Sequence, residues 1–327
     1  FYVYSLICTK NKKMLDNILS NKLFFVQILI MLGASLLGFL LINPQEMPFR
    51  SVLGIATFVL NWYIIIRYFR EDESLKENSY TIWFFSVWMI SFVPFFLDYR
   101  LGAAFLLMNY VMIHCFRFEN EKNDPKNAFD IGFFFAISCM FLPPLILFLP
   151  LLFVYFLSLY AIDKKIGWIF LIGFLFPILS LAQIAYLLDF DFLLHYFKQQ
   201  IMIKGVVWQY EYLFLLPVVL TLILAFIDHF VHENKQAANR KRMYILSIIF
   251  MIISLIIFGL YSGTEIYFLA FLALPISIML AKYVKHRKPK YTAYKNIVLI
   301  GFLVCMLFFA FFDKMPKVYT LFREVTI

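Results

Sequence analysis

Apolar runs of about 20 residues recur along the whole chain and are separated by short polar connections. A helix of that length is long enough to cross the roughly 30 Å hydrocarbon core of a membrane. The connections contain turn-forming and helix-breaking pairs such as Asn43-Pro44, Asp124-Pro125 and Ser262-Gly263. The pattern therefore predicts an all-α protein, a polytopic bundle of transmembrane helices that forms a single domain over residues 23–312. About eleven membrane segments are expected, at 23–42, 51–69, 80–97, 101–116, 131–142, 145–162, 166–188, 211–231, 243–261, 265–281 and 296–312.

The stretch 131–162 decides the topology of everything that follows it. It contains no charged residue and is interrupted by Pro143, Pro144 and Pro150. A single helix of this length would be longer than the roughly 30 Å core, and two helices would be short for two crossings. Two short crossings and a re-entrant hairpin both fit the pattern, and both return the chain to the side from which it came.

The distribution of Lys and Arg favours that even number of passes. With an even pass, 22 of the 29 basic residues fall on one side of the membrane and 7 on the other; with a single pass the division is 15 to 14. Lys and Arg are retained on the cytoplasmic side during insertion. We therefore expect the N-terminal segment 1–22 to be cytoplasmic and the C-terminal tail 313–327 to lie outside. The other loops expected in the cytoplasm are 70–79, 117–129, 163–165, 232–242 and 282–295.

Composition supports a membrane protein and argues against several other classes. Hydrophobic residues make up 63% of the chain and charged residues 15%, and the mean hydropathy is +0.84, which leaves too little polar surface for a soluble protein. The net charge of +9 comes from clusters between apolar runs, which favours contact with anionic lipid headgroups over nucleic acid. The four cysteines are isolated, and phosphate-loop, dinucleotide-binding, zinc-protease and serine-hydrolase motifs are missing. No cofactor and no metal site is expected.

The loop 189–210 is the most informative connection, because its spacing predicts an amphipathic helix on the outer face. We expect its apolar side in the interface and its polar side toward water or substrate, with Lys204-Gly205 as the signal that ends the helix. A helix that only caps the bundle is the alternative. The apolar side comprises Phe190, Leu193, Leu194, Phe197 and Ile201, and the polar side comprises Asp191, His195, Lys198, Gln199 and Met202.

Polar residues expected on the same outer face form a candidate vestibule. A membrane enzyme acting on a lipid-linked substrate needs a general base and cation-binding groups at such a place. Each residue also has a simpler interpretation: Asp98 and Arg100 bracket a turn, where a local ion pair or helix cap is expected, and Glu265 is expected in the first turn of a helix. The candidate catalytic residues are Glu46, Asp98, Asp191, His195 and Glu265.

Few other polar residues fall within the apolar runs. A cluster at the cytoplasmic end of one segment is interpreted as interfacial anchoring, because it lies near the water boundary: Asp228, His229 and His232. Four amides are expected to form hydrogen bonds between helices: Gln27, Asn61, Asn109 and Gln183. The 42 Phe and 20 Tyr are interpreted as lipid-facing bulk and interfacial belts.

Two stretches resemble an uncharacterised family of Bacteroidota inner-membrane proteins. One runs from Phe129-Asp130-Ile131-Gly132 to Gly167-Trp168-Ile169, and the other from Tyr261-Ser262-Gly263-Thr264-Glu265 to Ala273-Leu274-Pro275-Ile276. The resemblance extends from about Met14 to the end of the chain. Some members carry the label carotene monooxygenase, but the histidines here are dispersed and do not form a four-His iron site: His114, His195, His229, His232 and His286.

A weaker resemblance is to membrane glycosyltransferases that use polyprenyl-phosphate sugars, whose middle helices include Pro-interrupted pairs like Phe141-Leu142-Pro143-Pro144-Leu145. Those enzymes have a large first outer loop with acidic catalytic residues, whereas here that loop is 43–49 with Glu46 as its sole acid. The leading hypothesis is a multi-pass component of the bacterial inner membrane, a non-catalytic subunit or lipid-handling protein whose partners are membrane lipids or an envelope protein. The alternatives are a glycosyltransferase-like enzyme acting on a lipid-linked substrate at the outer face and, third, a transporter.

Overall fold

The computed structural model describes residues 19, 24–39, 50–71, 79–117, 125–159, 165–188, 190–231, 238–286 and 292–312. These residues form helices, and the sole strand-like pairing among them is an isolated bridge between Val206 and Gly263. The all-α prediction is therefore confirmed for this part of the chain. The helices are α3 (Phe24–Phe39), α4 (Arg50–Glu71), α5 (Tyr80–Met89), η2 (Ile90–Leu97), α6 (Tyr99–Arg117), α7 (Pro125–Phe141), η3 (Pro143–Phe148), α8 (Leu149–Leu159), α9 (Lys165–Leu188), α10 (Phe190–Gln200), η4 (Tyr210–Leu215), α11 (Leu216–Val231), α12 (Ala238–Tyr261), η6 (Ile266–Leu272), α13 (Ala273–His286) and α14 (Thr292–Phe311).

Seven helical stretches among the described residues are long and apolar enough to cross a membrane. Two further apolar helices are shorter, at Phe25–Phe39 and Pro143–Leu157. Several of the seven combine a 3-10 turn with an α-helix, as where η6 continues into α13. The long stretches are Ser51–Phe69, Tyr80–Leu97, Lys165–Leu187, Tyr210–Phe230, Met243–Tyr261, Ile266–Lys285 and Ala293–Phe311.

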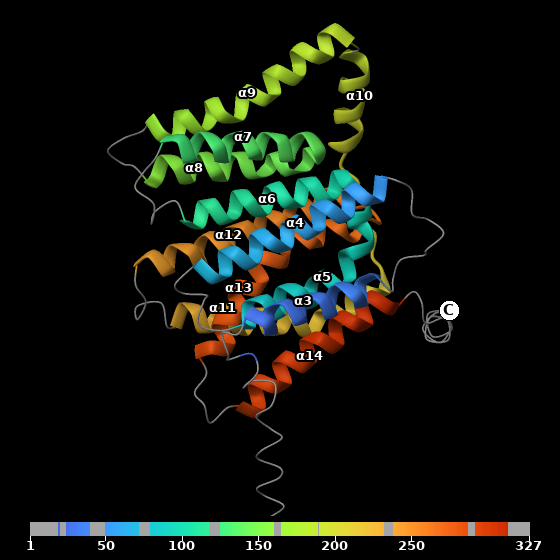
Figure 1. The fold of residues 1–327 in the computed structure, drawn as a ribbon, viewed down its shortest axis with the longest axis vertical. Helices are drawn as coiled ribbons and strands as arrows, with labels where there is room; N and C mark the ends of the chain where they lie inside the picture. The colour runs from blue at the N-terminus through green and yellow to red at the C-terminus, as the bar shows by residue number, and fades with distance from the viewer. Residues whose placement is uncertain are drawn as a thin grey trace, which may run out of the picture.

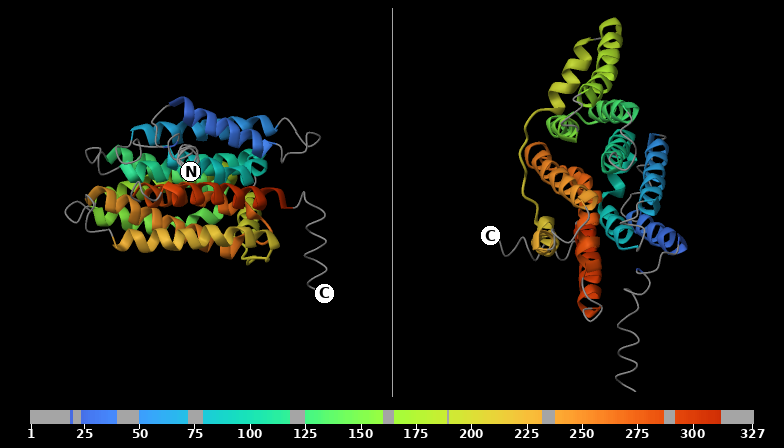
Figure 2. Two further views of the ribbon diagram at one scale, coloured as in Figure 1. Left: turned by 90° about the horizontal axis from the view of Figure 1, so that it is seen from below. Right: turned by 90° about the vertical axis from the view of Figure 1, so that its left-hand side faces the viewer.

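The helices lie side by side across the molecule, so that the bundle has two ends (Figures 1 and 2). We call the end that carries α10 the α10 end; it also holds the turns at Asp98, Pro143 and Gly263. The opposite end is where α4 finishes and α9 begins. The most enclosed stretches are Tyr80–Leu97 and Ile266–Lys285, with 78% and 89% of their residues buried, and they form the centre of the bundle.

Long-range hydrogen bonds stabilise the centre as well as packing, among them one from Trp88. The indole Nε1 of Trp88 donates a hydrogen bond to the carbonyl of Leu269 at 3.0 Å. The rings of Phe84 and Trp88 both pack on Phe302 of α14, with centroids 5.0 and 6.3 Å apart. A buried indole N–H needs an acceptor, and a 3-10 segment offers carbonyls that are less regularly paired than those of an α-helix.

The described part of this stretch, 131–159, folds as a hairpin, with α7 and η3–α8 side by side. The next helix, α9, runs parallel to α7 and packs so closely on it that Gly132 faces the Phe170 carbonyl and Gly173 faces the Phe129 carbonyl, with no room for a Cβ at either glycine. Since α7 and α9 point the same way, the chain enters and leaves the hairpin at the same end of the bundle (Figure 1).

The predicted hydrogen bonds between helices form in part. The Asn109 side-chain amide donates to the Asn61 side-chain oxygen at 3.0 Å, which ties α6 to α4, and the Gln27 amide reaches the Ser79 hydroxyl at 3.4 Å. All four side chains are buried. Gln183 is exposed on α9 and has no hydrogen bond to any described residue, so its prediction is wrong.

Candidate functional site

The Pro143–Pro144 break creates an attachment point for α10. In an α-helix the Met140 carbonyl would accept the N–H of residue 144, but proline has none, and the Leu145 N–H bonds to Leu142 instead of Phe141. The Tyr196 hydroxyl of α10 fills this gap. It donates to the Phe141 carbonyl at 3.0 Å and lies 3.4 Å from the Met140 carbonyl.

Burial raises the pKa of the Tyr196 phenol, and the nearby Arg100 guanidinium opposes that shift. The phenol therefore keeps its proton and remains a donor to the carbonyls at the end of α7. Tyr196 is a residue that the sequence analysis missed, because it was counted among the aromatic residues of the interface.

Helix α10 is amphipathic, as the spacing of residues 189–210 predicted, and its polar side is exposed. Asp191 lies in its first turn and Lys198 in its last, which suits the helix dipole. His195 contacts the Gln199 amide at 2.9 Å, and both are exposed. Within the described residues no hydrogen bond or ion pair links Asp191, His195 and Glu265.

The segment 201–209, here called the strap, crosses from α10 toward α11 and pairs with the turn after α12. The amides of Lys204 and Gly205 donate to the Leu260 carbonyl at 3.0 Å, and the Gly263 amide donates to the Gly205 carbonyl at 2.7 Å. Gly205 and Gly263 have positive φ angles of 69° and 56°, which favour glycine. We had expected Lys204-Gly205 to end the helix. Instead, α10 ends at Gln200, and Gly205 allows the backbone to turn within the strap.

A polar cluster lies where the strap meets η6. The Lys204 ammonium is 3.9 Å from the Glu265 carboxylate, and both side chains are about half exposed. The same carboxylate lies near the Tyr267 hydroxyl, two residues further along the chain. Asp98 and Tyr196 are near enough to act on that hydroxyl electrostatically.

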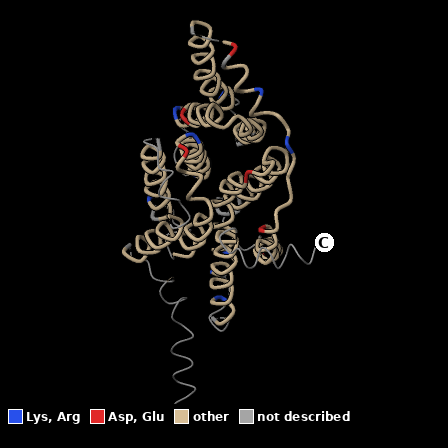
Figure 3. Tube along the Cα trace, turned by 90° about the vertical axis from the view of Figure 1, so that its right-hand side faces the viewer, with Lys and Arg blue, Asp and Glu red and all other residues tan. Residues whose placement is uncertain are grey.

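The five candidate residues of the predicted vestibule are thus divided. Asp98 lies at the start of α6 and Glu265 near Lys204 and Tyr267, whereas Asp191 and His195 lie on the exposed side of α10, and Glu46 falls outside the described residues. Figure 3 shows this end, where charged positions are few along the coloured trace.

The structure tests the local roles that were expected of Asp98 and Glu265. The Asp98 carboxylate accepts a hydrogen bond from the Arg100 backbone amide at 2.9 Å, which confirms it as the cap of α6. The sequence analysis had predicted Glu265 in the first turn of a helix. Instead, Glu265 immediately precedes η6 in an extended conformation.

An apolar cavity of about 510 Å³ lies under the strap, between α11, α12 and the η6–α13 helix. Val206 and Trp208 of the strap line it on one side. Tyr212 also lines it, is 9% exposed, and its hydroxyl has no hydrogen-bond partner among the described residues. Helical side chains around the rest of the wall are apolar, among them Val218, Val219, Leu222, Leu255 and Leu272.

The cavity and the polar cluster adjoin along the strap, since Lys204 and Val206 are two residues apart. Pro143 and Pro144 do not line the cavity. The break that they cause in the helix leaves open the carbonyl to which the Tyr196 hydroxyl donates. In the part of the chain that the structure describes, no group of three His, Cys, Asp or Glu side chains is placed to hold a metal ion.

The structure differs from the sequence analysis at one further polar cluster, at the opposite end. His229 is 1% exposed and contacts Lys282, so the interpretation of His229 as an interfacial anchor is wrong. His232, from the same predicted cluster, lies outside the described residues. Its neighbour Asp228 is partly buried.

Long apolar helices around a buried aromatic centre define the chain as a helical membrane protein. A family model matches residues 14–319, and the chain belongs to that family, the family of unknown function DUF6427. No curated protein and no solved structure matches the chain.

Proposed function

We propose that this protein is a lipid-handling component of the bacterial inner membrane that holds a long-chain amphiphile at its α10 end. The cavity of about 510 Å³ under the strap carries the proposal. Its size is within the roughly 300–1,000 Å³ range of ligand pockets. An apolar wall with one buried hydroxyl suits a hydrocarbon chain whose polar end lies at Tyr212.

The Tyr212 hydroxyl gives this site its polarity. A buried hydroxyl without a partner costs about 1–3 kcal/mol, and an ester or phosphate oxygen of a bound amphiphile would recover that cost. Trp208 packs on Tyr212 with ring centroids 5.6 Å apart and is exposed on its other side. Trp and Tyr are typical of the boundary between hydrocarbon and headgroups.

The proposal includes a topology with the α10 end outside and the opposite end in the cytoplasm. It is supported by the 22 to 7 division of basic residues and by the parallel course of α7 and α9, which returns the 131–162 hairpin to its starting end. With eleven passes, the N-terminal segment would be cytoplasmic and the C-terminal tail outside.

Native purification tests the function. Mass spectrometry of the protein released from membranes should detect a bound lipid, and Val219→Trp should remove it, because Val219 lines the cavity and the larger ring narrows it. Leu220→Trp is the matched control, since Leu220 is equally exposed on α11 but does not line the cavity. Equal lipid content in both variants would contradict the proposal. A stoichiometric envelope protein in place of lipid would favour a subunit role.

A second candidate is an enzyme acting on a lipid-linked substrate, such as a polyprenyl-phosphate sugar, at the same end. It is favoured by the Glu265 carboxylate near the Tyr267 hydroxyl and by a second carboxylate, Asp98, at the same end. In that case Glu265→Gln would abolish turnover while the bound lipid remained. Unchanged turnover in both Glu265→Gln and Asp98→Asn would exclude this role for the pair.

A further inference from the structure

The cavity under the strap has a deep wall and a mouth, which differ in exposure. The deep wall is formed by the η6–α13 helix, where the lining side chains of Leu272 and Ile276 are 3% and 2% exposed. Lining side chains of α11 and α12 include three apolar ones that are about half exposed: Val219 (50%), Ile223 (49%) and Leu255 (46%). Side chains that both line a cavity and reach the surface lie at its opening. The cavity therefore has a mouth between α11 and α12.

This mouth lies at the depth of the hydrocarbon core. The central helix α13 packs against both α11 and α12, and the cavity lies between these two helices. Val219 and Ile223 are the tenth and fourteenth of the 21 residues in the stretch Tyr210–Phe230, and Leu255 is the thirteenth of 19 in Met243–Tyr261. Residues in the middle of membrane-spanning helices meet lipid chains. The mouth therefore opens sideways into the bilayer.

The strap closes the cavity at the α10 end. Four backbone hydrogen bonds of 2.7–3.0 Å join the strap to Leu260 and Gly263, and the Gln209 side-chain amide donates to the Thr264 carbonyl at 3.2 Å. The ion pair of the strap with Glu265 adds to these contacts. A ligand that passed between the strap and the bundle would have to break them, whereas a ligand that passes between α11 and α12 breaks none of them.

We infer that the ligand of this cavity is a lipid of the bilayer that enters sideways between α11 and α12, while the strap stays closed. The inference rests on the proposed function, because it assumes a long-chain amphiphile in the cavity. It adds the source of that ligand, which is the membrane and not the water beyond the strap. A chain on the lateral route stays in apolar surroundings throughout, so the route avoids the cost of exposing hydrocarbon to water.

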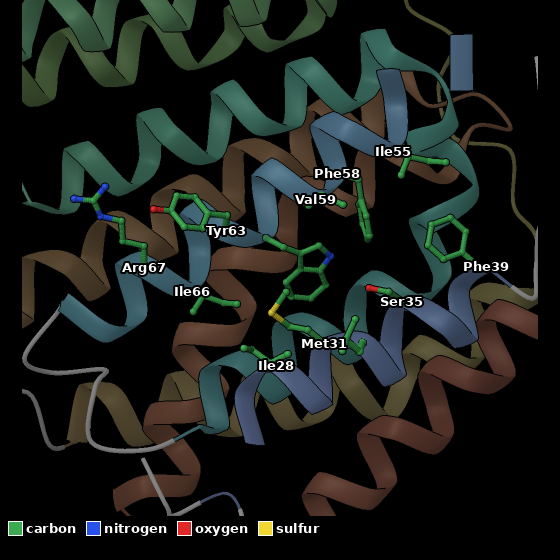
Figure 4. Close-up of a pocket in the computed structure, with 12 residues that line it drawn as sticks. Ile28, Met31, Ser35, Phe39, Ile55, Phe58, Val59, Tyr63, Ile66 and Arg67 are labelled. Carbon is green, nitrogen blue, oxygen red and sulfur yellow. The ribbon is translucent and has the colours of Figure 1, made fainter. Parts of the chain in front are cut away.

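A second cavity, of about 760 Å³, lies between α3 and α4 and provides a comparison (Figure 4). Its wall is also largely apolar and includes Ile28 and Met31 of α3 and Ile55 and Phe58 of α4. The residues that line it all belong to these two helices, so none of them comes from a segment that crosses its end. Val59 lines this second cavity and is 60% exposed, which makes it a matched control position for the mouth.

The test is whether a lipid reaches the deep wall when the strap cannot open. The full chain with Lys204→Cys and Glu265→Cys, and with Cys8 and Cys305 replaced by serine, is reconstituted in vesicles of phosphatidylethanolamine and phosphatidylglycerol. A short bis-methanethiosulfonate then joins the two new cysteines. Phosphatidylethanolamine with a diazirine midway along one chain is added afterwards from cyclodextrin. Illumination should label Leu272 as strongly as in the unlinked protein, which peptide mass spectrometry measures.

Two other results are possible, and they have different meanings. Labelling of Leu272 that is lost on linking and returns on reduction would overturn the inference, because the lipid would then enter under the strap. Absence of labelling at Leu272 in both the linked and the unlinked protein would contradict the proposed function, and the inference would fail with it.

Substitutions at the mouth test the route from the other side. Ile223→Trp narrows the gap between α11 and α12 and should remove most of the labelling of Leu272, whether the strap is linked or free. Ile223→Ala widens the gap and should increase the labelling, which separates a blocked mouth from a general disturbance of α11. Val59→Trp, in the second cavity, should leave the labelling unchanged. Equal labelling in Ile223→Trp and Val59→Trp would overturn the lateral route.

Discussion

The Lys282 side-chain nitrogen on α13 contacts the Nδ1 of His229 on α11, and both side chains are buried, at 5% and 1% exposure. The ammonium also lies 3.7 Å from the centre of the Tyr244 ring on α12. Two protonated nitrogens cannot share this contact, because one of them must supply a lone pair. The lysine and histidine therefore join three helices while carrying at most one positive charge on this contact.

Substitutions at this contact should have unequal effects on stability. His229→Ala removes an acceptor from a buried ammonium and opens a cavity, whereas Lys282→Met removes the charge and keeps the length of the side chain. We expect His229→Ala to lower the free energy of unfolding by about 1–3 kcal/mol more than Lys282→Met does. Thermal unfolding in detergent, followed by circular dichroism, measures the difference. A larger loss in Lys282→Met would contradict this view.

Tyr196→Phe should loosen α10 while the bundle stays intact. The substitution keeps the ring but leaves the carbonyls of Met140 and Phe141 without the phenol donor, at a cost of about 1–2 kcal/mol. Hydrogen exchange of residues 190–200 should become faster, since local opening requires less energy. Tyr186→Phe on the exposed face of α9 is the control and should leave that exchange unchanged. No change in either variant would show that the bond does not hold α10.

Gly263→Ala should destabilise the strap because Gly263 has a φ of +56°. An alanine there costs about 1–2 kcal/mol, and the paired segment 204–207 would be strained with it. Gly259→Ala, in α12 with open space around its Cα, should be neutral or slightly stabilising. Thermal unfolding of the two variants compares them directly, and equal melting temperatures would refute the prediction.

The proposed topology can be tested by cysteine labelling in cells. Cys8 and Cys305 are first replaced by serine. Cys115 and Cys139 are kept, because both are buried. A cysteine at Gln199, exposed on α10, should react with a membrane-impermeant thiol reagent added from outside. A cysteine at Lys126, exposed at the start of α7, should react only after the membrane is opened. The reverse pattern would invert the assignment of the two ends.

Asn109→Leu should weaken the bundle because it breaks the bond to Asn61 and leaves a buried amide behind. Hydrogen bonds between membrane helices contribute about 0.6–2 kcal/mol. Gln183→Leu, on the exposed side of α9, should leave the unfolding midpoint unchanged. Unfolding titrations in mixed detergent compare the two, and a loss of similar size in both would show that burial does not decide the effect.

The positions of the helices were predictable from the sequence because hydropathy is a local property. Each apolar run needs only its own composition to be recognised, and the turns at Asn43-Pro44 and Ser262-Gly263 are local signals as well. The return of 131–162 to its starting end was predictable from the distribution of basic residues, because insertion acts on loops one at a time. The amphipathic helix α10 was predictable because the spacing of its apolar and polar residues is also a local pattern.

The candidate site was predictable only in part. Asp98 caps α6 and Glu265 lies 3.9 Å from Lys204, but the positions of Tyr196 and Tyr212 were missed. In a chain with 20 tyrosines, no local pattern distinguishes a ring that faces lipid from one whose hydroxyl meets a carbonyl left open by proline. Polar side chains within helices show the same limit: Asn109 is buried and Gln183 is exposed.

The sequence by itself determined the class of the protein, the approximate bounds of its apolar helices and the even course of the 131–162 hairpin, because each depends on hydrophobicity and charge along the chain. The tertiary structure decided how each helix is rotated about its axis and which neighbours it meets. That rotation buries His229 against Lys282, directs Tyr196 to the end of α7, and opens the two cavities. The contacts of His229 and Tyr196 join residues more than 50 positions apart, so they arise from packing between helices and leave no local signal in the chain.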